Sequence, residues 1–428
     1  MGESSYKTEG ERVLLAYLCA KKRMNPELPF ELVLRDTRGD YTVVFEPGET
    51  RGMQHYFLQR MPECVSAYAN PSTALRMSEV DTPYEIHVDQ SRPGPRALVT
   101  GCSGLLGSML AEKLLEKGYQ VIGIDNGLCS KQSNLSKIID NPNFYFCSHD
   151  VTKPFTIMGR LDMVLHLASI PSPALYYRMP LETLDVGILG TLYTLDIAVQ
   201  KGGRYLFAST SEVYGNPEVN PQPENYWGNV DPMGIRSPYD ESKRGSETLI
   251  ELYHKKYDLD VRIARIFNTY GPGMRLSDGR VITSFLQSLL KDKPLIVHGS
   301  GNQTRSFAYV TDTVDGLVRL LDYDDWIMKQ VQDDTYYAGL SQIQERVFNI
   351  GNPTEFTINE LAQIVVDLGR EKLGKNATIE HIDQFDATDP YLRRPDITKA
   401  QKLLNFNPTV SLTEGLTKTL DYFLHTQT

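Results

Sequence analysis

The chain has 428 residues, of which 41% are hydrophobic and 23% are charged, and its formal net charge is −10. This length favours two or three domains, and the acidic balance argues against nucleic acid or an anionic membrane as the main partner, because phosphate-rich surfaces are normally bound by basic ones. The five cysteines form no CxxC pair, which predicts reduced thiols in a cytoplasmic protein, with no disulfide framework and no metal site. The longest early apolar run, at 13–20, is too short to span a bilayer and lacks the arrangement of a signal peptide.

Residues 1–92 are predicted to form a small α/β appendage. The spacing of apolar residues at 10–24 is helical, and FELVLRDTRGDYTVVFEPG reads as two strands around a turn that contains glycine. The segment ends in QSRPGPR, where two prolines and a glycine mark a linker or the entry to a loop. No chemical motif is present in this part, and its role stays open.

Residues 93–270 alternate between short apolar strands and helices. One amphipathic helix is expected at 108–118, and strands are expected at 96–101, 120–126, 163–169, 205–210 and 261–268. A further strand is expected outside this range, at 346–351. This alternation predicts an α/β fold with a doubly wound parallel sheet of the Rossmann type. From residue 271 the pattern loosens, so we expect residues 271–428 to form mainly a smaller substrate-binding lobe, with some chain returning to the sheet.

The segment TGCSGLLG places Gly101, Gly104 and Gly107 between the first of these strands and the helix. Glycines at such a turn let the backbone approach a pyrophosphate and let the helix pack closely on the sheet. Asp125 ends the next strand, where a carboxylate accepts hydrogen bonds from a ribose diol and repels a 2′-phosphate, so NAD is favoured over NADP. The alternative is that Asp125 is a solvated turn residue. Further residues expected to line the cofactor are Leu105, Leu106, Asn126, Asp150, Val151, Leu167, Ala168 and Ser169.

Two further patterns indicate acid–base chemistry. In SPYDESKRGSE, Tyr239 and Lys243 are four residues apart, so on a helix they share a face, and the ammonium is expected to lower the pKa of the phenol. In FASTSEVYG, Thr210, Ser211 and Glu212 follow directly where a strand ends. Each pattern also has an ordinary interpretation, as a surface pair and as a solvated strand end.

Taken in order, the glycine loop, Asp125, HLAS, Thr210, Tyr239 and Lys243 resemble the extended short-chain dehydrogenase/reductase family of nucleotide-sugar enzymes. More narrowly, ASTSEVYG, NYWGNVDPMGIRSPYDESKR, ARIFNTYGPGMRLSDGRV, GSGNQTRSFAYVTD and RRPDITKA are similar to the UDP-glucuronate decarboxylases. This resemblance runs from about residue 96 to about residue 425, and the strings at 224–247 and 393–400 are the most specific. It implies a tightly bound, catalytic NAD and a UDP-sugar substrate.

The resemblance also implies roles for particular residues. Tyr239, aided by Lys243 and Thr210, would take the proton from the hydroxyl on sugar carbon 4 while hydride passes to the cofactor. Ser211 and Glu212 would serve the loss of carbon dioxide or the protonation of carbon 5. Arg393 would orient the uronate carboxylate, although sequence alone does not distinguish it from Arg394, and either is also readable as a surface charge. Further substrate contacts are expected from Tyr176, Asn268, Arg280 and Arg305, and a homodimer is expected through helices that include 185–200 and 238–256.

Two departures from the family pattern bear on substrate detail. Gly187 stands where the family usually has Asn, and ASIPSPALYYRMP differs from the usual Pro-Ala-Ser-Pro form. The rival interpretations are a nucleotide-sugar 4,6-dehydratase or 4-epimerase on the same scaffold, and a regulatory protein that binds NAD without chemistry. Intact Thr210, Tyr239 and Lys243 argue against the last of these.

Overall fold

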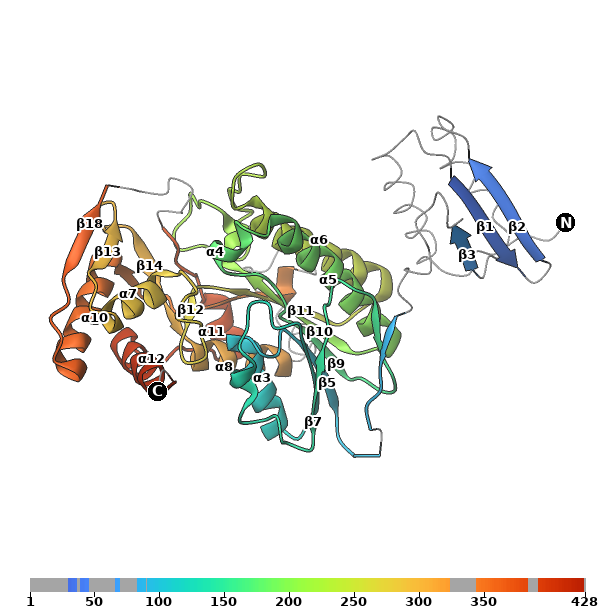
Figure 1. Cartoon of the computed structure of the whole chain (residues 1–428), viewed down its shortest axis with the longest axis horizontal. Helices are drawn as coiled ribbons and strands as arrows, with labels where there is room; N and C mark the ends of the chain where they lie inside the picture. The colour runs from blue at the N-terminus through green and yellow to red at the C-terminus, as the bar shows by residue number, and fades with distance from the viewer. Residues whose placement is uncertain are drawn as a thin grey trace. The chain divides into compact units, whose positions relative to one another are not determined.

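The computed structural model describes residues 30–36, 39–45, 66–69, 83–89, 91–323, 344–383 and 392–426. The chain divides into two compact units, Met1–Tyr84 and Glu85–Thr428. In the first unit, β1 (Phe30–Asp36) pairs antiparallel with both β2 (Gly39–Phe45) and β3 (Ser66–Ala69) (Figure 1). The two strands expected around a turn are therefore present, whereas the helix expected at 10–24 lies outside the described residues.

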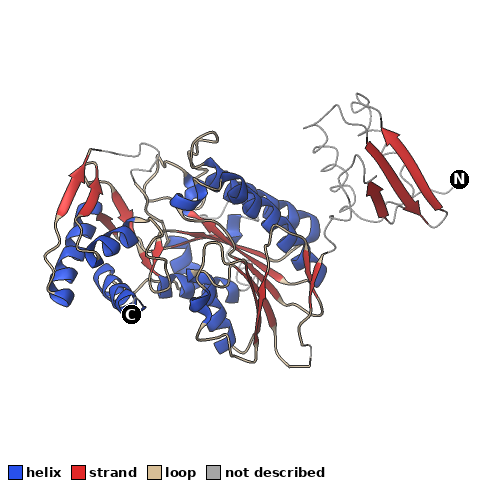
Figure 2. Ribbon diagram, viewed as in Figure 1, coloured by secondary structure: helices blue, strands red, loops and turns tan. Residues whose placement is uncertain are grey.

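The second unit is built on a seven-stranded parallel sheet with the order β16-β11-β10-β9-β5-β6-β7 (Figure 2). This arrangement confirms the predicted doubly wound α/β class. The strands are β5 (Arg96–Thr100), β6 (Gln120–Asp125), β7 (Phe144–Ser148), β9 (Met163–His166), β10 (Arg204–Thr210), β11 (Val261–Ile266) and β16 (Val347–Ile350).

Helices cover both faces of this sheet, which is why its central strands are continuous apolar runs. Alternate side chains of β5 enter different cores: Ala97 and Val99 pack with the helices α3 (Leu105–Glu116) and α8 (Val310–Asp322), and Leu98 packs with α5 (Pro180–Lys201) and α6 (Ser237–Tyr257). In Figure 1 the pair α5 and α6 lies on the opposite side of the sheet from α3 and α8.

The order of the strands reverses at β5, because β6 and β7 extend the sheet to one side and β9, β10, β11 and β16 extend it to the other. In an open parallel sheet, such a reversal leaves a crevice beyond the carboxyl ends of the two adjoining strands. Here these ends belong to β5 and β9, and the segments that follow them are the glycine loop and Leu167–Ser169. The topology therefore places the predicted cofactor residues at the crevice.

A smaller lobe follows β12 (Thr269–Tyr270). It contains α7 (Val281–Leu290), β13 (Leu295–His298), β14 (Thr304–Ser306), β15 (Ala308–Tyr309), β17 (Glu355–Thr357), α10 (Ile358–Leu373), β18 (Ile379–Ile382) and α12 (Leu412–Thr426). Within this part of the chain α8, β16 and α11 (Thr398–Leu404) pack back on the large lobe. Three segments that follow the start of the smaller lobe in the sequence thus belong to the large lobe, and the two lobes form one compact unit.

Some element boundaries differ from the sequence-based expectation. Helix α3 begins at Leu105, directly after Gly104 and not at 108, and β9 ends at His166 because Leu167 and Ala168 turn toward Thr100, whose hydroxyl accepts both of their N–H groups. The unit boundary falls within the short strand β4 (Tyr84–Ile86), which pairs with β8 (Phe155–Ile157), and so lies before the linker residues at 91–96. Within the described ranges no helix is both long and apolar enough to cross a membrane.

Gly187 lies on α5, packed against Ser242 of α6. A Cβ atom at this position would be 2.4 Å from the Cβ and 2.7 Å from the Oγ of Ser242, and the carbonyl of Gly187 accepts a hydrogen bond of 2.7 Å from the Ser246 hydroxyl. The side chain of Ser242 thus fills the space that a residue larger than glycine would need. The hydroxyl of Ser242 donates in turn to the carbonyl of Tyr239 at 2.8 Å.

We therefore expect Gly187→Asn to lower the free energy of unfolding by about 1–3 kcal/mol, the usual cost of overpacking. Chemical denaturation of the variant and the wild type measures this loss. The double variant with Ser242→Gly, which vacates the contested space, should recover part of it. A single variant as stable as the wild type would show that α5 and α6 separate without cost.

Candidate active site

A cavity of about 840 Å³ lies at the carboxyl ends of the sheet strands, and all residues predicted for the site line it. On the expected cofactor side these are Gly101, Gly104, Leu105, Leu106, Gly107, Asp125, Asn126, Asp150, Val151, Leu167, Ala168 and Ser169. On the expected substrate side they are Tyr176, Thr210, Ser211, Glu212, Tyr239, Lys243, Asn268, Arg280, Arg305 and Arg393. Residues far apart in the sequence thus share one site of a size that suits a cofactor and a substrate.

The glycine loop connects β5 to α3, and there is no room for a larger residue at Gly101 or at Gly107. Gly101 has φ +69°, and a Cβ on it would lie 2.8 Å from the backbone nitrogen of Ala168, while a Cβ on Gly107 would lie 2.1 Å from the carbonyl oxygen of Gly101. Gly104 is the N-cap of helix α3 and has no side chain to cap it, which leaves N–H groups of the first turn for a ligand. These features fit the pyrophosphate of a dinucleotide.

The Asp125 carboxylate is held in place at the end of β6. It accepts hydrogen bonds from the backbone of Ser103 at 3.0 Å and of Gly127 at 2.8 Å, and from the Ser130 hydroxyl at 2.8 Å. The residue is buried and lines the cavity, so it is not a solvated turn residue. A carboxylate oriented in this way has acceptor capacity left for a ribose diol and repels a 2′-phosphate, which fits NAD.

Tyr239 and Lys243 lie one turn apart on α6 and both are buried. The Nζ atom of Lys243 is 6.0 Å from the centre of the Tyr239 ring and 4.7 Å from that of Phe207, and it donates to the carbonyl of Ala208 at 2.8 Å. Thr210 ends β10 and makes a side-chain hydrogen bond that lowers the pKa of Tyr239. The strand end and the helix pair are therefore parts of one centre.

The expected lowering of the Tyr239 pKa was wrong. Burial outweighs the hydrogen bond from Thr210 and raises the pKa of the Tyr239 phenol, and the Glu212 carboxylate raises it further. Burial likewise lowers the pKa of Lys243 to about 7. The sequence shows the spacing of Tyr239 and Lys243 but not how deeply they are buried. Burial disfavours both the phenolate of Tyr239 and the ammonium of Lys243.

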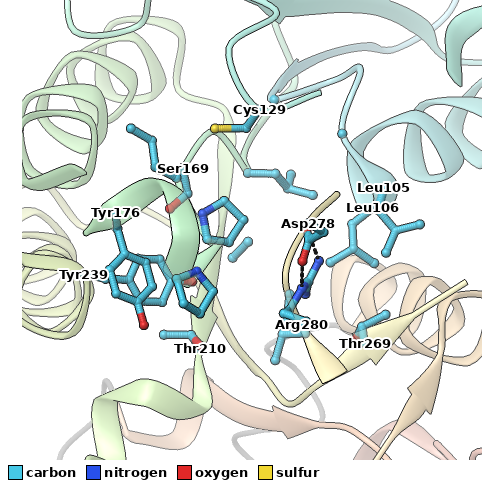
Figure 3. A pocket seen from close by; sticks show the side chains of 18 of the residues that line it. Leu105, Leu106, Cys129, Ser169, Tyr176, Thr210, Tyr239, Thr269, Asp278 and Arg280 are labelled. Atoms are coloured by element: carbon cyan, nitrogen blue, oxygen red, sulfur yellow. Dashed lines mark hydrogen bonds and ion pairs between the residues drawn. The ribbon is translucent and has the colours of Figure 1, made fainter. Parts of the chain in front are cut away.

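Tyr176, on the short helix α4 (Pro173–Tyr176), lies face to face with Tyr239 (Figure 3). The two ring centroids are 5.5 Å apart and the ring planes are within 4° of parallel. The Tyr176 hydroxyl is buried and has no hydrogen-bond partner among the described residues. This stacking fixes the Tyr239 ring.

Glu212 is the centre of an Arg–Glu–Arg cluster. One carboxylate oxygen accepts from Arg393, and the other accepts from the Nη2 of Arg236 at 2.5 Å. Burial by itself raises the pKa of Glu212, but the guanidiniums of Arg393 and Arg236 outweigh burial and hold this pKa at about 2. The carboxylate therefore stays ionised at neutral pH and does not donate a proton of its own.

The sequence did not show whether Arg393 or Arg394 belongs to the site, and the structure places the two side chains in different surroundings. Arg393 is buried and lines the cavity, donating to the Ser211 hydroxyl at 3.1 Å and to the Gly215 carbonyl at 2.9 Å as well as to Glu212. Arg394 is half-exposed and lies 3.5 Å from Glu355. The guanidinium of Arg393 is thus already engaged by groups of the chain.

The other expected substrate residues lie in the smaller lobe or next to it. Arg280 precedes α7 and pairs with Asp278 (Figure 3). The backbone carbonyl of Asp278 accepts a hydrogen bond of 2.7 Å from the Ser172 hydroxyl. Arg305 lies on β14 and is buried, and Asn268 follows β11. The cations present here suit the phosphates of a nucleotide sugar.

Two arginines that line the cavity, Arg236 and Arg275, were not predicted from the sequence. Arg236 precedes α6 by one residue and is three residues before Tyr239, a spacing that a helical reading of this segment could have revealed. Arg275 donates to the carbonyls of Gly127 and Leu128, at 3.2 and 3.1 Å, and so joins the smaller lobe to the loop after β6 beside the cofactor side of the cavity. Among the described residues, no group of His, Cys, Asp and Glu side chains is arranged to hold a metal ion.

Asp240, next to Tyr239, is buried beside the cluster. Burial and the Glu212 carboxylate raise the pKa of Asp240 to about 7, against about 3.9 in an unfolded chain. Between these two pKa values the native state holds a proton that the unfolded state has lost, so the free energy of unfolding contributed by Asp240 falls as pH rises from about 4 to about 7.

We expect Asp240→Asn to remove this part of the pH dependence. Urea denaturation between pH 4 and 8 should show the variant gaining stability relative to the wild type as pH rises through this window. A difference between the two proteins that does not change with pH would contradict a protonated Asp240 in the native state.

The fold and the site define an extended short-chain dehydrogenase/reductase. A family model described as GDP-mannose 4,6 dehydratase matches residues 98–419. UDP-glucuronic acid decarboxylase 2 of Arabidopsis thaliana is 44% identical over 332 residues, which cover 78% of this chain and 69% of the relative. UDP-glucuronic acid decarboxylase 1 of Danio rerio is 40% identical over 365 residues, which cover 85% of this chain and 81% of the relative. The chain belongs to the UDP-glucuronic acid decarboxylase family.

A solved structure of a related enzyme has a similar fold. The UDP-glucuronic acid 4-epimerase of Bacillus cereus, in complex with UDP-glucuronic acid and NAD, matches with a TM-score of 0.64 and 28% identity, over 77% of this chain and 99% of the epimerase. Residues Met1–Tyr84 lie outside the range of the family model.

Proposed function

We propose that this protein decarboxylates UDP-glucuronate to UDP-xylose through a 4-keto intermediate, with a tightly bound NAD. The observation that carries the proposal is a single cavity that brings together a dinucleotide cradle, the Thr210–Tyr239–Lys243 centre and the cluster around Glu212. Relatives at 40–44% identity that bear the name of this activity support it. The residues proposed for the site are those that line the cavity and were expected from the sequence.

In the first stage Tyr239 accepts the proton of the hydroxyl on sugar carbon 4. When bound, NAD supplies the oxidant, taking hydride from carbon 4 and later returning it. The Tyr239 phenol needs a lower pKa for this task than burial gives it, and Thr210 and Lys243 are the groups placed to favour the phenolate. The stacked ring of Tyr176 holds the phenol in position.

In the second stage the carbon 4 ketone is β to the carboxylate on carbon 5. The bond between carbons 5 and 6 breaks, its electron pair forms an enolate across carbons 4 and 5, and carbon dioxide leaves. A proton from water is then added to carbon 5, hydride returns to carbon 4, and Tyr239 gives its proton back to the oxygen on carbon 4. Glu212 carries a fixed negative charge beside Arg393, so it acts by holding Arg393 and a proton-bearing water, with Ser211 hydrogen-bonded to the same guanidinium.

The main rival is an epimerase or dehydratase on the same scaffold. A structural neighbour is itself a 4-epimerase crystallised with UDP-glucuronic acid, so a site for a carboxylated sugar does not exclude epimerisation. The relatives named as decarboxylases are markedly more similar in sequence, at 40–44% against 28% identity, and this favours decarboxylation.

Incubation of the purified full chain with UDP-glucuronate and catalytic NAD⁺ tests the proposal. We expect carbon dioxide and a UDP-pentose in equal amounts. UDP-galacturonate with no carbon dioxide would support the epimerase, and a 4-keto-6-deoxy product formed from a neutral UDP- or dTDP-sugar would support the dehydratase. A protein that binds NAD and converts none of these sugars would be the regulatory protein.

We also infer a homodimer formed through α5 and α6. These helices expose apolar side chains that the chain itself leaves uncovered, namely Leu181 and Leu184 on α5 and Leu252 and Tyr257 on α6. Light scattering after size exclusion tests this arrangement, and Leu252→Glu should shift the mass toward that of a monomer. Cytoplasmic location stays a prediction from the cysteine pattern.

A further inference from the structure

An ion pair beneath the active site joins α6 to the two strands that end there. Arg265 on β11 donates to both carboxylate oxygens of Glu247 on α6, at 3.0 Å from Nε and 2.7 Å from Nη2, and each of the two side chains is only 14% exposed. The Ser209 hydroxyl of β10 donates to the same carboxylate at 2.6 Å. Ser209 and Arg265 are opposite each other on adjacent strands, so one carboxylate of α6 spans both strands.

The carboxylate of Glu247 completes a row of contacts between the end of β10 and one face of α6. Glu247 comes four residues after Lys243 and eight after Tyr239, so the three side chains follow one another on the same face of the helix. Each of the last three residues of β10 contacts one of them, in the pairs Ala208–Lys243, Ser209–Glu247 and Thr210–Tyr239. Because the contact through Glu247 continues to β11, it holds α6 against two strands at once.

Arg265 is itself held in place by groups on the sheet side. Its Nη1 donates to the Tyr214 hydroxyl at 3.0 Å and to the Glu224 carbonyl at 2.9 Å, and its guanidinium carbon lies 5.0 Å from the centre of the Tyr214 ring. The Tyr214 hydroxyl donates in turn to the side chain of Asn349 on β16 at 2.8 Å. A guanidinium with these partners has little freedom to move, so the sheet sets the position of Glu247.

Glu247 also bears on the charge of Lys243. Burial lowers the pKa of Lys243, and the Glu247 carboxylate raises it against this effect. His166, on β9, faces Lys243 as well, but burial and the charge of Lys243 lower the pKa of His166 to about 3, so this imidazole is neutral. Glu247 therefore supports the ammonium form of Lys243 as well as the placement of the helix.

We propose that Glu247 is a positioning residue of the catalytic centre. By holding α6 against β10 and β11, it keeps the Tyr239 phenol beside Thr210 and in reach of the hydroxyl on sugar carbon 4. This inference deepens the proposed function and rests on its first stage, the removal of the proton at carbon 4. The rival epimerase and dehydratase would share that stage.

Consumption of UDP-glucuronate in a single turnover of the NAD⁺-loaded full chain, at saturating sugar, tests the proposal. We expect Glu247→Gln to slow it between about tenfold and about 10²-fold, the cost of a small misplacement of the reacting groups. The Kd of UDP, from isothermal titration, and the NAD content should stay within about twofold of the wild type. Glu251→Gln, one turn further along α6 and paired with Lys255, is the matched control and should change none of the three values.

The Tyr239→Phe background separates positioning from a general structural role. Because Glu247 is proposed to act through the phenol, Glu247→Gln should slow the Tyr239→Phe protein by less than about threefold. Where Glu247→Gln does not fold, Ser209→Ala removes only the hydroxyl that reaches Glu247 at 2.6 Å. Compared in the same two backgrounds, it should slow only the protein that has Tyr239.

An equal loss in the two backgrounds would show a structural role and overturn the inference. A Glu247→Gln protein with the wild-type rate would overturn it as well. A wild-type protein whose product keeps the carboxylate would overturn the proposed function alone, because the comparison of the two backgrounds does not depend on the later fate of the sugar.

Discussion

Tyr239→Phe is expected to reduce turnover of UDP-glucuronate by about 10³-fold, within the range of 10²–10⁴ that a positioned general base contributes. The variant loses only the phenolic oxygen, which is the atom proposed to take the proton from carbon 4. The ring that stacks on Tyr176 at 5.5 Å is kept, so the buried packing around it should survive. Release of carbon dioxide under single-turnover conditions measures the loss directly.

The control for this variant is Tyr253→Phe on the same helix. Its hydroxyl donates to Asp196 at 2.6 Å on the exposed side of α6, and its removal should leave turnover within a few-fold of the wild type. The NAD content of both variants should equal that of the wild type. A Tyr239→Phe protein that retains full activity would show that another group takes the proton.

Glu212→Gln is expected to keep NAD bound and to lose release of carbon dioxide by at least about 10²-fold. The change is isosteric, and it removes the negative charge that Arg393 and Arg236 hold between them. A neutral amide no longer keeps Arg393 and a proton-bearing water in place for the step at carbon 5. Titration of UDP-glucuronate separates this loss from weaker binding.

Glu218→Gln is the matched control, since Glu218 is exposed and lies outside the cavity lining. It should retain the activity of the wild type. A Glu212→Gln protein with full activity would rule Glu212 out of the decarboxylation step and would leave the cluster a binding role only.

The parts of the site that local spacing encodes were predictable from the sequence. A strand, a turn with Gly101 and Gly104, and a helix with Gly107 in its first turn follow one another within residues 96–116, so their geometry is set by neighbours in the chain. The same holds for Tyr239 and Lys243, which are one helical turn apart. Resemblance to a family added Tyr176, Asn268, Arg280, Arg305 and Arg393, and the structure places all of them at the same cavity.

Features that depend on depth and on distant partners were not predictable. The pairing of Arg393 with Glu212 joins residues separated by 181 positions, and only the folded chain shows that Glu212 also has Arg236 as a partner. The pKa of Tyr239 was expected in the wrong direction because desolvation depends on tertiary packing. The fit of Gly187 against Ser242 is likewise a contact between two helices.

The central claim is that the hydride removed from carbon 4 returns to the same sugar after carbon dioxide has left. UDP-glucuronate labelled with deuterium at carbon 4, incubated with less NAD⁺ than sugar, tests it by NMR of the product. We predict UDP-xylose that keeps deuterium at carbon 4, with one carbon dioxide released for each pentose formed. Product that retains the carboxylate, or a pentose without deuterium, would contradict the account.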